Sequence, residues 1–235
     1  MSDTYSCNLC GSTTFRSINS RKLMQCAECL SFERTRLMGL YLEKLNLGSD
    51  ARVLHLAPEK GIYDYLSKRI RPENYVTADY TPSMYRYVEN CRFIDLCDMD
   101  GWDTNSFDVI IHAHVLEHTP CNIAYTLFHL HRMLKPDGVH FCVIPFVSGA
   151  WDETFADIGD TARHDRFGQF DHVRRFGMTD IKQSLGNILR LPVGLDVRND
   201  FPEELLHRHR IPEYCWRGLN ASMVLQLKKE DYLLV

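Results

Sequence analysis

Residues 53–79 constrain the fold more than any other part of the chain. The apolar run 53–57 predicts a buried strand, residues 58–61 predict a tight turn, and the apolar residues that follow recur at helical spacing. A second short strand, 75–78, ends at Asp79. A strand, a turn into a helix N-terminus, a second strand and a carboxylate describe the nucleotide-binding half of a doubly wound α/β fold, where the carboxylate can accept both ribose hydroxyls. The alternative is an ordinary βαβ unit in which Asp79 is only a turn residue.

Strands and helices alternate through the following residues. Three further strands are expected at 92–94, 106–111 and 139–144, and an amphipathic helix at 123–134 precedes the last of them. Alternation at this interval is typical of a parallel sheet with helices on both faces. The fold class expected from the pattern is therefore α/β.

Other segments are less regular. A short helix is expected after Thr81, with Met84, Tyr87 and Val88 facing inward. Residues 145–176 are polar and aromatic without clear periodicity, and a connection of this length is usually a functional loop. The remaining expected elements are a helix at 179–189 and two late strands at 194–197 and 223–227, which would pair antiparallel at the sheet edge.

Two Cys-x-x-Cys pairs stand near the N-terminus, Cys7 with Cys10 and Cys26 with Cys29, and fifteen residues separate the pairs. Four thiolates at this spacing can surround one Zn²⁺ tetrahedrally, and the small hairpin between them needs the metal to fold. Four unrelated buried cysteines and a redox dithiol are the alternatives. The spacing favours a structural zinc ribbon, assigned to residues 1–33.

A helix is expected directly after the ribbon. Ser31 can cap it, the apolar residues from Met38 to Leu45 share one face, and Gly48 ends it. Because no flexible linker intervenes, the ribbon is expected to pack against the second domain, residues 34–235.

Composition narrows the partners. The formal net charge is −4, and the first 50 residues carry six basic against five acidic side chains, which makes nucleic acid an unlikely partner. The sequence lacks a membrane-spanning apolar run and a signal peptide, so neither a membrane nor secretion is expected. The nine cysteines are an odd number, with four of them in the paired motifs, which suits a reducing cytoplasm better than a disulfide framework. The oligomeric state stays open.

From about residue 34 to the end, the chain resembles the class I S-adenosylmethionine-dependent methyltransferases, which have a Rossmann-like doubly wound sheet. Five places carry the resemblance in order: 53–61, Asp79, Asp95-Leu96, the stretch 107–118 that reads FDVI followed by VLEH, and 133–138 with LKPDG. The ribbon, together with FGQFDHVR at 167–174, resembles a bacterial subgroup of that superfamily.

The resemblance implies a cofactor, S-adenosylmethionine, and a set of residues that hold it. The turn from Ala57 to Gly61 would face its methionine part, Asp79 its ribose, and Asp95 with Leu96 its adenine. His112 and His114 would lie near the sulfonium and the substrate.

The cofactor turn departs from the family pattern. The family reads Asp/Glu-x-Gly-x-Gly-x-Gly, and the matching positions here are His55, Ala57, Glu59 and Gly61. Glycine lets the backbone approach the cofactor and adopt a positive φ. Either Glu59 points at the cofactor's ammonium group as a replacement carboxylate, or the affinity for the cofactor is reduced. The first interpretation is favoured.

Methyl transfer to a hydroxyl needs alignment and a base, and histidine is the natural base near neutral pH. The first candidate is His172, beside Asp171, which could orient its ring. His114 is the second candidate, whereas His112 and His118 are as well explained as packing residues.

The spacing His114-x-x-Glu117-His118 also matches an inverted zinc-protease motif. That site needs a continuous helix. Here the motif starts at a strand tip and meets Pro120, so a protease is not expected.

Three functions are compatible with these patterns. The leading one is a methyltransferase that acts on a small metabolite or a sugar at oxygen or nitrogen. The second is an RNA or protein methyltransferase whose ribbon holds the macromolecule. The third is a non-catalytic binding module with a degenerate methyltransferase fold, suggested by the missing glycines.

Overall fold

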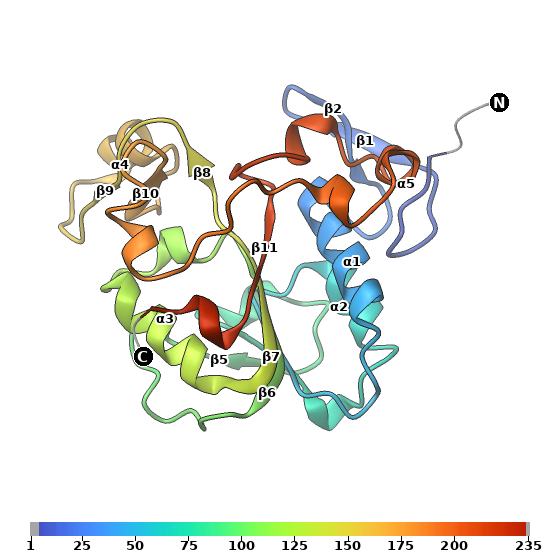
Figure 1. The fold of residues 1–235 in the computed structure, drawn as a ribbon, viewed down its shortest axis with the longest axis horizontal. Coiled ribbons are helices and arrows are strands. Elements are labelled where there is room, and N and C mark those ends of the chain that lie inside the picture. The colour runs from blue at the N-terminus through green and yellow to red at the C-terminus, as the bar shows by residue number, and fades with distance from the viewer. Residues whose placement is uncertain (1–4, 234–235) are drawn as a thin grey trace.

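The computed structural model describes residues 5–233 and, within them, places a six-stranded sheet at the centre (Figure 1). Across the sheet the strands are β11 (Val224–Leu227), β7 (Leu134–Val143), β6 (Phe107–Ala113), β3 (Val53–Leu56), β4 (Tyr75–Asp79) and β5 (Cys91–Phe93). Neighbouring strands are parallel except at one edge, where β11 runs antiparallel to β7. The strand order reverses between β3 and β6, and the crevice beyond their carboxyl ends is the switch point at which such sheets bind ligands.

Helices cover both faces of this sheet (Figure 1). The helices α1 (Glu33–Leu45) and α2 (Lys60–Leu66) pack on one face, and α3 (Ile123–Met133) packs on the other. All four residues of β3 are buried, as expected for a central parallel strand covered on both sides. The predicted α/β class and the doubly wound sheet are confirmed.

Residues 145–176, expected as a loop, contain a small folded lobe. Its elements are β8 (Phe146–Val147), β9 (Asp152–Glu153), α4 (Asp160–Phe167) and β10 (Arg174–Gly177). β10 lies between the other two strands, parallel to β8 and antiparallel to β9. Figure 1 shows this lobe above the sheet, on the side opposite to the ribbon.

Two predictions for the C-terminal part are wrong. Residues 179–189 form turns and a single 3₁₀ segment instead of a helix, with Gly186 in that segment. Residues 194–197 do not form a strand: the chain turns at Gly194 with φ +68°, and Asp196 makes only an isolated bridge to Arg217. The strand expected at 223–227 is confirmed as β11, and its partner is β7.

The remaining elements are short. One is α5 (Glu203–Arg208), and the 3₁₀ segments are η1 (Pro72–Asn74), η2 (Pro82–Met84), η3 (Leu116–His118), η4 (Leu185–Asn187), η5 (Val197–Asn199), η6 (Glu213–Cys215) and η7 (Lys229–Asp231). Within residues 5–233, no helix combines the length and the apolar composition that crossing a membrane requires.

Two local predictions also need correction. The segment after Thr81 makes one 3₁₀ turn, so the expected inward face does not form and Met84 is 73% exposed. Ser31 does not cap α1, whose N-cap is Phe32. The Ser31 hydroxyl lies instead 3.3 Å from Cys7 Sγ and 3.2 Å from Cys29 Sγ.

The N-terminal hairpin of β1 (Phe15–Ile18) and β2 (Arg21–Cys26) is antiparallel, as predicted, and the ribbon packs on α1 and α2. Leu9 is the contact residue. A Cβ atom on Gly39 would lie 2.6 Å from Leu9 Cδ2, and one on Gly61 would lie 3.0 Å from Leu9 Cδ1 and 3.4 Å from Cys29 Sγ. The two glycines therefore allow the ribbon to approach the helices.

A buried arginine joins the ribbon, α1 and the C-terminal segment. Arg36 has no exposed surface, and its guanidinium donates hydrogen bonds to four backbone carbonyls. The acceptors are the carbonyls of Met24, Ser31, His209 and Arg210. The expected packing of the ribbon against the second unit is confirmed, whereas the boundary between residues 33 and 34 stays a prediction.

The substitution Gly39→Ala tests this packing. In a helix interior, alanine is ordinarily more stable than glycine by about 1 kcal/mol. Here the added methyl meets Leu9 and Asn8, so we expect a loss of about 1–3 kcal/mol in the free energy of unfolding, measured by denaturant titration. The control is Gly48→Ala, where a Cβ meets nothing within 4 Å. Equal or higher stability of Gly39→Ala would contradict the packing described.

Candidate functional site

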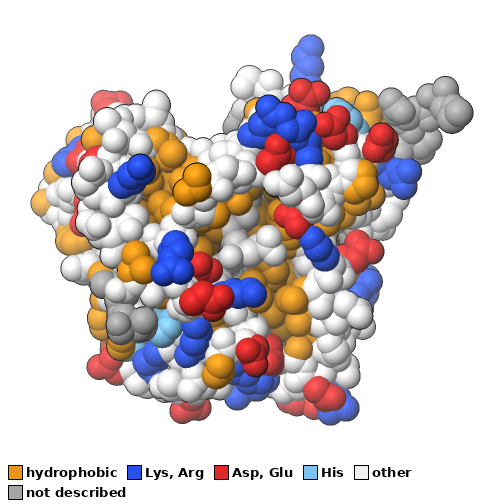
Figure 2. All heavy atoms as spheres, in the orientation of Figure 1, with side chains coloured by type: hydrophobic (Ala, Val, Ile, Leu, Met, Phe, Trp, Pro, Cys, Tyr) orange, Lys and Arg blue, Asp and Glu red, His pale blue; other side chains and the backbone are white. Residues whose placement is uncertain are grey.

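The carboxyl ends of the sheet strands face a hollow between two lobes. One lobe contains α4 and β8–β10, and the other contains the ribbon and α5 (Figure 1). Figure 2 shows the surface notched between these lobes. The switch point between β3 and β6 opens at this end of the sheet, so the residues predicted for the site can be located around it.

The turn after β3 has the backbone conformation that the family's glycines favour. Ala57 has φ +47°, and its N–H donates to the Ala78 carbonyl on β4 at 3.0 Å. A left-handed conformation costs a non-glycine residue about 1 kcal/mol. The Tyr87 hydroxyl donates to the Pro58 carbonyl at 2.6 Å and holds the other side of the turn.

The two other predicted turn residues face the ribbon side. Glu59 Oε1 accepts hydrogen bonds from Arg34 Nη2 and from Thr35 Oγ1, both at 3.1 Å. These bonds connect the turn to α1 and leave Oε2 as the remaining oxygen. Gly61 is buried against Leu9 of the ribbon, where a larger side chain would crowd Leu9.

Two half-buried carboxylates lie at the ends of β4 and β5: Asp79 is the last residue of β4, and Asp95 follows β5 by two residues. Asp79 Oδ1 accepts the Thr81 N–H at 2.7 Å, and Oδ2 accepts the Tyr85 hydroxyl at 2.9 Å. Asp95 Oδ1 accepts the Cys97 N–H at 2.8 Å. Each carboxylate oxygen can accept a second bond, so both side chains keep capacity for a ligand.

The strand pairing brings these two carboxylates to the same edge. The Ile94 N–H, next to Asp95, donates to the Asp79 carbonyl at 3.0 Å. The exposed rings of Tyr80 and Phe93 lie beside them, with centroids 5.6 Å apart. An apolar surface beside two carboxylates fits a nucleoside, and sequence reasoning missed this aromatic pair. Leu96, which follows Asp95, is buried.

Two histidines predicted near the cofactor lie in the core. His55 is buried, its Nδ1 lies 2.8 Å from the Tyr75 hydroxyl, and burial lowers its pKa to about 3. His112 has no exposed surface and packs against His140, with ring centroids 4.8 Å apart. Burial first, and then neighbouring histidines, lower the pKa of His112 far below its usual range. This corrects the expected position of His112 beside the sulfonium, because its side chain points into the core.

His114 and Glu117 stand where β6 ends. His114 has φ +55°, its Nε2 lies 2.9 Å from the Ala221 carbonyl oxygen, and its Nδ1 lies 3.3 Å from Glu117 Oε1. Both neighbouring atoms are hydrogen-bond acceptors. Burial raises the pKa of the Glu117 carboxyl, but the His114 and His118 rings together with a backbone N–H lower it, and the net direction is downward.

The predicted base, His172, and the predicted orienting residue, Asp171, do not pair with each other. Asp171 Oδ2 lies 3.2 Å from Nδ1 of His118, not beside the ring of His172. His172 Nδ1 lies 3.2 Å from the Phe167 carbonyl oxygen, so this nitrogen carries the proton. The His118 and His172 rings pack edge to face, with centroids 4.7 Å apart. Burial first, then the His118 ring, lower the pKa of His172.

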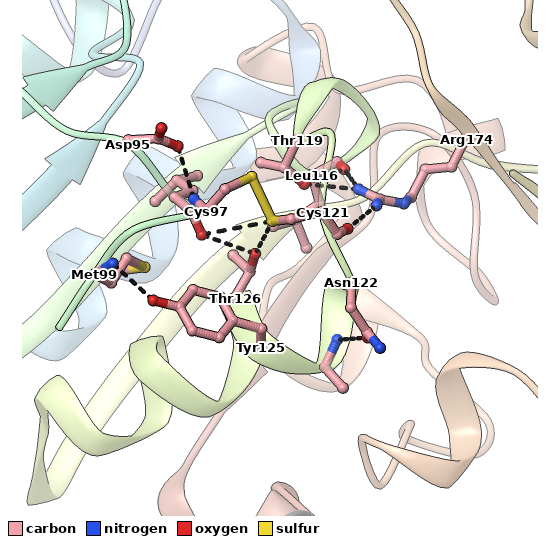
Figure 3. Close-up of a disulfide and its surroundings, with 12 residues drawn as sticks. Asp95, Cys97, Met99, Leu116, Thr119, Cys121, Asn122, Tyr125, Thr126 and Arg174 are labelled. Carbon is pink, nitrogen blue, oxygen red and sulfur yellow. Dashed lines mark hydrogen bonds between the residues drawn. A yellow bond between two sulfur atoms is a disulfide. The ribbon is translucent and has the colours of Figure 1, made fainter. Parts of the chain in front are cut away.

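Arg174 fixes the segment that carries these residues. Its buried guanidinium donates to the carbonyls of Leu116 and Cys121 and, at 2.6 Å, to the Thr119 hydroxyl (Figure 3). Its Nε donates to Glu153 at 2.7 Å. Arg174 therefore holds the loop after β6 against the small lobe.

A disulfide joins Cys97 to Cys121, with Cα atoms 5.6 Å apart (Figure 3). It links the loop after Asp95 to the loop that carries Glu117. Sequence reasoning missed it, because the two cysteines are separated by 24 residues in no recognisable motif.

The four ribbon cysteines converge as predicted. The sulfur atoms of Cys7 and Cys29 lie 3.5 Å apart, those of Cys10 and Cys26 lie 3.6 Å apart, and all four lie within 4.8 Å of one another. Four thiolates bound to one Zn²⁺ lie about 3.8 Å apart. The donor set therefore fits this ion.

A doubly wound sheet with these features at its switch point is typical of class I methyltransferases. Residues 32–187 match the family model described as a methyltransferase domain, which covers most of the chain. The chain belongs to this family and is an S-adenosylmethionine-dependent methyltransferase, an enzyme.

No curated protein matches the sequence. The YcgJ protein of Bacillus subtilis is similar at 17% identity, over 75% of this chain and 78% of that one, with a TM-score of 0.44. The 1,6-didemethyltoxoflavin-N1-methyltransferase of Burkholderia thailandensis is similar at 18% identity, over 66% of this chain and 65% of that one, with a TM-score of 0.43. A chain from the complex of the Haloferax volcanii Trm112 methyltransferase activator with a methyltransferase is similar at 14% identity. The similarity covers 82% of this chain and 87% of that one, with a TM-score of 0.46.

Removal of the disulfide is expected to destabilise the fold. Closing a loop of this length contributes about 3 kcal/mol through the unfolded state. We therefore expect the double variant Cys97→Ala/Cys121→Ala to lose about this free energy of unfolding in denaturant titrations without reductant. The control is Cys91→Ala, which removes a free thiol. Reductant should lower the stability of the control but not that of the double variant, and equal stability of all proteins without reductant would contradict the bond.

Proposed function

We propose that this methyltransferase transfers the methyl group of S-adenosylmethionine to oxygen or nitrogen of a small metabolite or a sugar. The observation that supports this most is the cluster of Glu117, His118 and His172, which gathers acid and imidazole groups where β6 ends. Bound at the switch point, the cofactor supplies an activated methyl group. The protein then has to align the acceptor and remove its proton.

In this proposal the cofactor lies along the carboxyl ends of β3, β4 and β5. Asp79 binds the ribose hydroxyls with the acceptor capacity that Thr81 and Tyr85 leave open. Asp95 and Leu96 face the adenine, and the left-handed turn at Ala57 presents backbone to the methionine part.

Within the turn, Glu59 is proposed to bind the cofactor through its side chain. Arg34 and Thr35 hold one oxygen of its carboxylate, and Oε2 is proposed to face the ammonium group. In that case Glu59 replaces the acidic residue that the family has before its glycines.

His172 is proposed to act on the acceptor. Its Nδ1 proton points at the Phe167 carbonyl, so Nε2 carries a lone pair, and its lowered pKa keeps the ring neutral near pH 7. Asp171 contributes by orienting His118, which packs against His172. His114 is less suited to accept a proton, because both of its ring nitrogens face acceptors.

The ribbon is proposed to bind one structural Zn²⁺ through Cys7, Cys10, Cys26 and Cys29. Because the ribbon packs on α1 and α2, this metal would stabilise the helix that follows the cofactor turn. The ribbon and the remainder of the chain are proposed as the units 1–33 and 34–235.

A second candidate function, RNA or protein methylation with the ribbon as the binding surface, receives less support. Two of the side chains near the ribbon, those of His209 and Arg210, are engaged in its packing. Arg210 Nε donates to the Leu23 carbonyl at 2.9 Å, and its guanidinium stacks on Tyr5, 4.5 Å from the ring centroid. His209 Nδ1 lies 2.8 Å from the Ser6 carbonyl oxygen.

The substitution Asp79→Asn tests the cofactor site. Loss of the carboxylate charge weakens the hydrogen bonds from the ribose, so we expect about tenfold weaker binding of S-adenosylhomocysteine by calorimetry. The matched control is Tyr85→Phe, which removes a hydrogen bond to Asp79 but keeps the carboxylate. Unchanged affinity of Asp79→Asn, or an equal loss in both variants, would contradict the assignment.

The substrate class is tested with cofactor that carries a labelled methyl group. We expect the full chain to label a component of a metabolite and sugar extract and to leave purified RNA and protein unlabelled. Label in RNA or protein and none in the extract would favour the second candidate function.

A further inference from the structure

Glu117 is the starting point, because its carboxylate is almost completely buried. Its side chain is 1% exposed, and neither oxygen has a hydrogen-bond partner among residues 5–233. The His114 ring approaches Oε1 to 3.3 Å without hydrogen-bonding geometry, and Oε2 has no donor in this part of the chain. A buried carboxylate normally has a cation or several donors directed at it.

Two histidines supply further ligand atoms at the same place. One carboxylate oxygen of Glu117 and one ring nitrogen each of His118 and His172 lie within 4.8 Å of one another. The residues come from two segments of the chain, η3 and the residues before β10. The Val173 N–H donates to the Glu117 carbonyl at 2.9 Å and joins these segments directly.

The outer hydrogen bonds of both histidines are those of metal ligands. A histidine that binds a metal usually donates its other ring N–H to a carboxylate or a backbone carbonyl. His118 Nδ1 faces the Asp171 carboxylate, and His172 Nδ1 faces the Phe167 carbonyl oxygen, both at 3.2 Å. In each ring the second nitrogen, Nε2, is left with a free lone pair.

We propose that Glu117, His118 and His172 bind a divalent transition metal, with Zn²⁺ as the ion that two imidazoles and one carboxylate suit. Ligands of one such ion lie about 3–3.5 Å apart, so small side-chain rotations complete the site. Three protein ligands leave one position of a tetrahedral zinc ion for the acceptor. This site differs from the protease motif, because His172 replaces His114 in the ligand set.

This inference rests on the proposed function and narrows its substrate class to acceptors with a hydroxyl. A hydroxyl oxygen bound at the open position loses its proton to solvent more readily, as metal-bound water does. The resulting alkoxide oxygen forms a bond to the methyl carbon while the carbon–sulfur bond breaks, and that electron pair stays on sulfur. His172 then acts on the acceptor through the ion instead of taking the proton itself.

The test is the metal content of the full chain. Protein equilibrated with ZnCl₂ and dialysed is analysed by mass spectrometry for zinc per chain. We expect the wild type to hold one equivalent more than Glu117→Gln and His118→Gln, while all variants keep the ribbon zinc. The control His164→Gln changes a histidine on α4 whose side chain is 69% exposed, and it should match the wild type.

A variant of Asp171, which positions His118, shows whether zinc is lost through the binding site or through misfolding. Asp171→Asn keeps the shape of the side chain but weakens its hydrogen bond to His118, so we expect about tenfold weaker binding of the additional zinc. The unfolding midpoint of protein that holds only the ribbon zinc should be unchanged. His118→Gln provides the result if Glu117→Gln does not fold, since the His118 side chain is 33% exposed.

The outcomes distinguish the two proposals. Equal zinc content in the wild type and in folded Glu117→Gln or His118→Gln overturns the metal site, even if methyl transfer is intact. Extra zinc in the wild type that these variants lose supports the metal site, even if S-adenosylhomocysteine does not bind, a result that would count against the proposed function alone.

Discussion

The buried guanidinium of Arg36 is the interaction on which the arrangement of this protein depends. It donates to carbonyls of the ribbon and of the segment after α5, so the ribbon and α1 share one side chain with a segment 173 residues further along the chain. A buried carbonyl that loses its donor costs about 1–3 kcal/mol. The neighbouring residues Arg34 and Thr35 then reach Glu59 from the same helix. Hydrogen bonds from α1 therefore connect the ribbon to the turn after β3.

The turn itself explains how a methyltransferase fold can lack most of the family's glycines. Ala57 adopts the left-handed conformation, which small side chains tolerate at moderate cost. Tyr87 and the Ala78 carbonyl hold the turn on both sides. Gly61, in contrast, is glycine because Leu9 and Cys29 of the ribbon lie against it. Gly61 matches a glycine of the family pattern, and in this chain it also lets the ribbon pack closely.

Sequence patterns predicted the elements whose signal is local. The buried strand β3, the sheet and the four cysteines of the ribbon follow from periodicity and spacing, and the structure confirms their placement. The pairing of Asp171 with His118 and the disulfide were not predicted, because they depend on how distant segments meet. For His112, the sequence left a packing role and a place beside the cofactor open, and the structure buries it. The helix expected at 179–189 failed for a related reason: apolar spacing alone does not distinguish a helix from turns whose apolar residues, Leu185 and Leu189, are buried by tertiary contacts.

The bond between Cys97 and Cys121 makes the sequence from the end of β5 to the start of α3 a closed covalent ring. This ring contains β6 and Glu117, and it begins two residues after Asp95. The disulfide therefore keeps the loop after Asp95 and the loop that carries Glu117 from moving apart. Arg174 bonds three residues of this ring, so the small lobe of α4 and β8–β10 is tied through it to the loop after Asp95 as well.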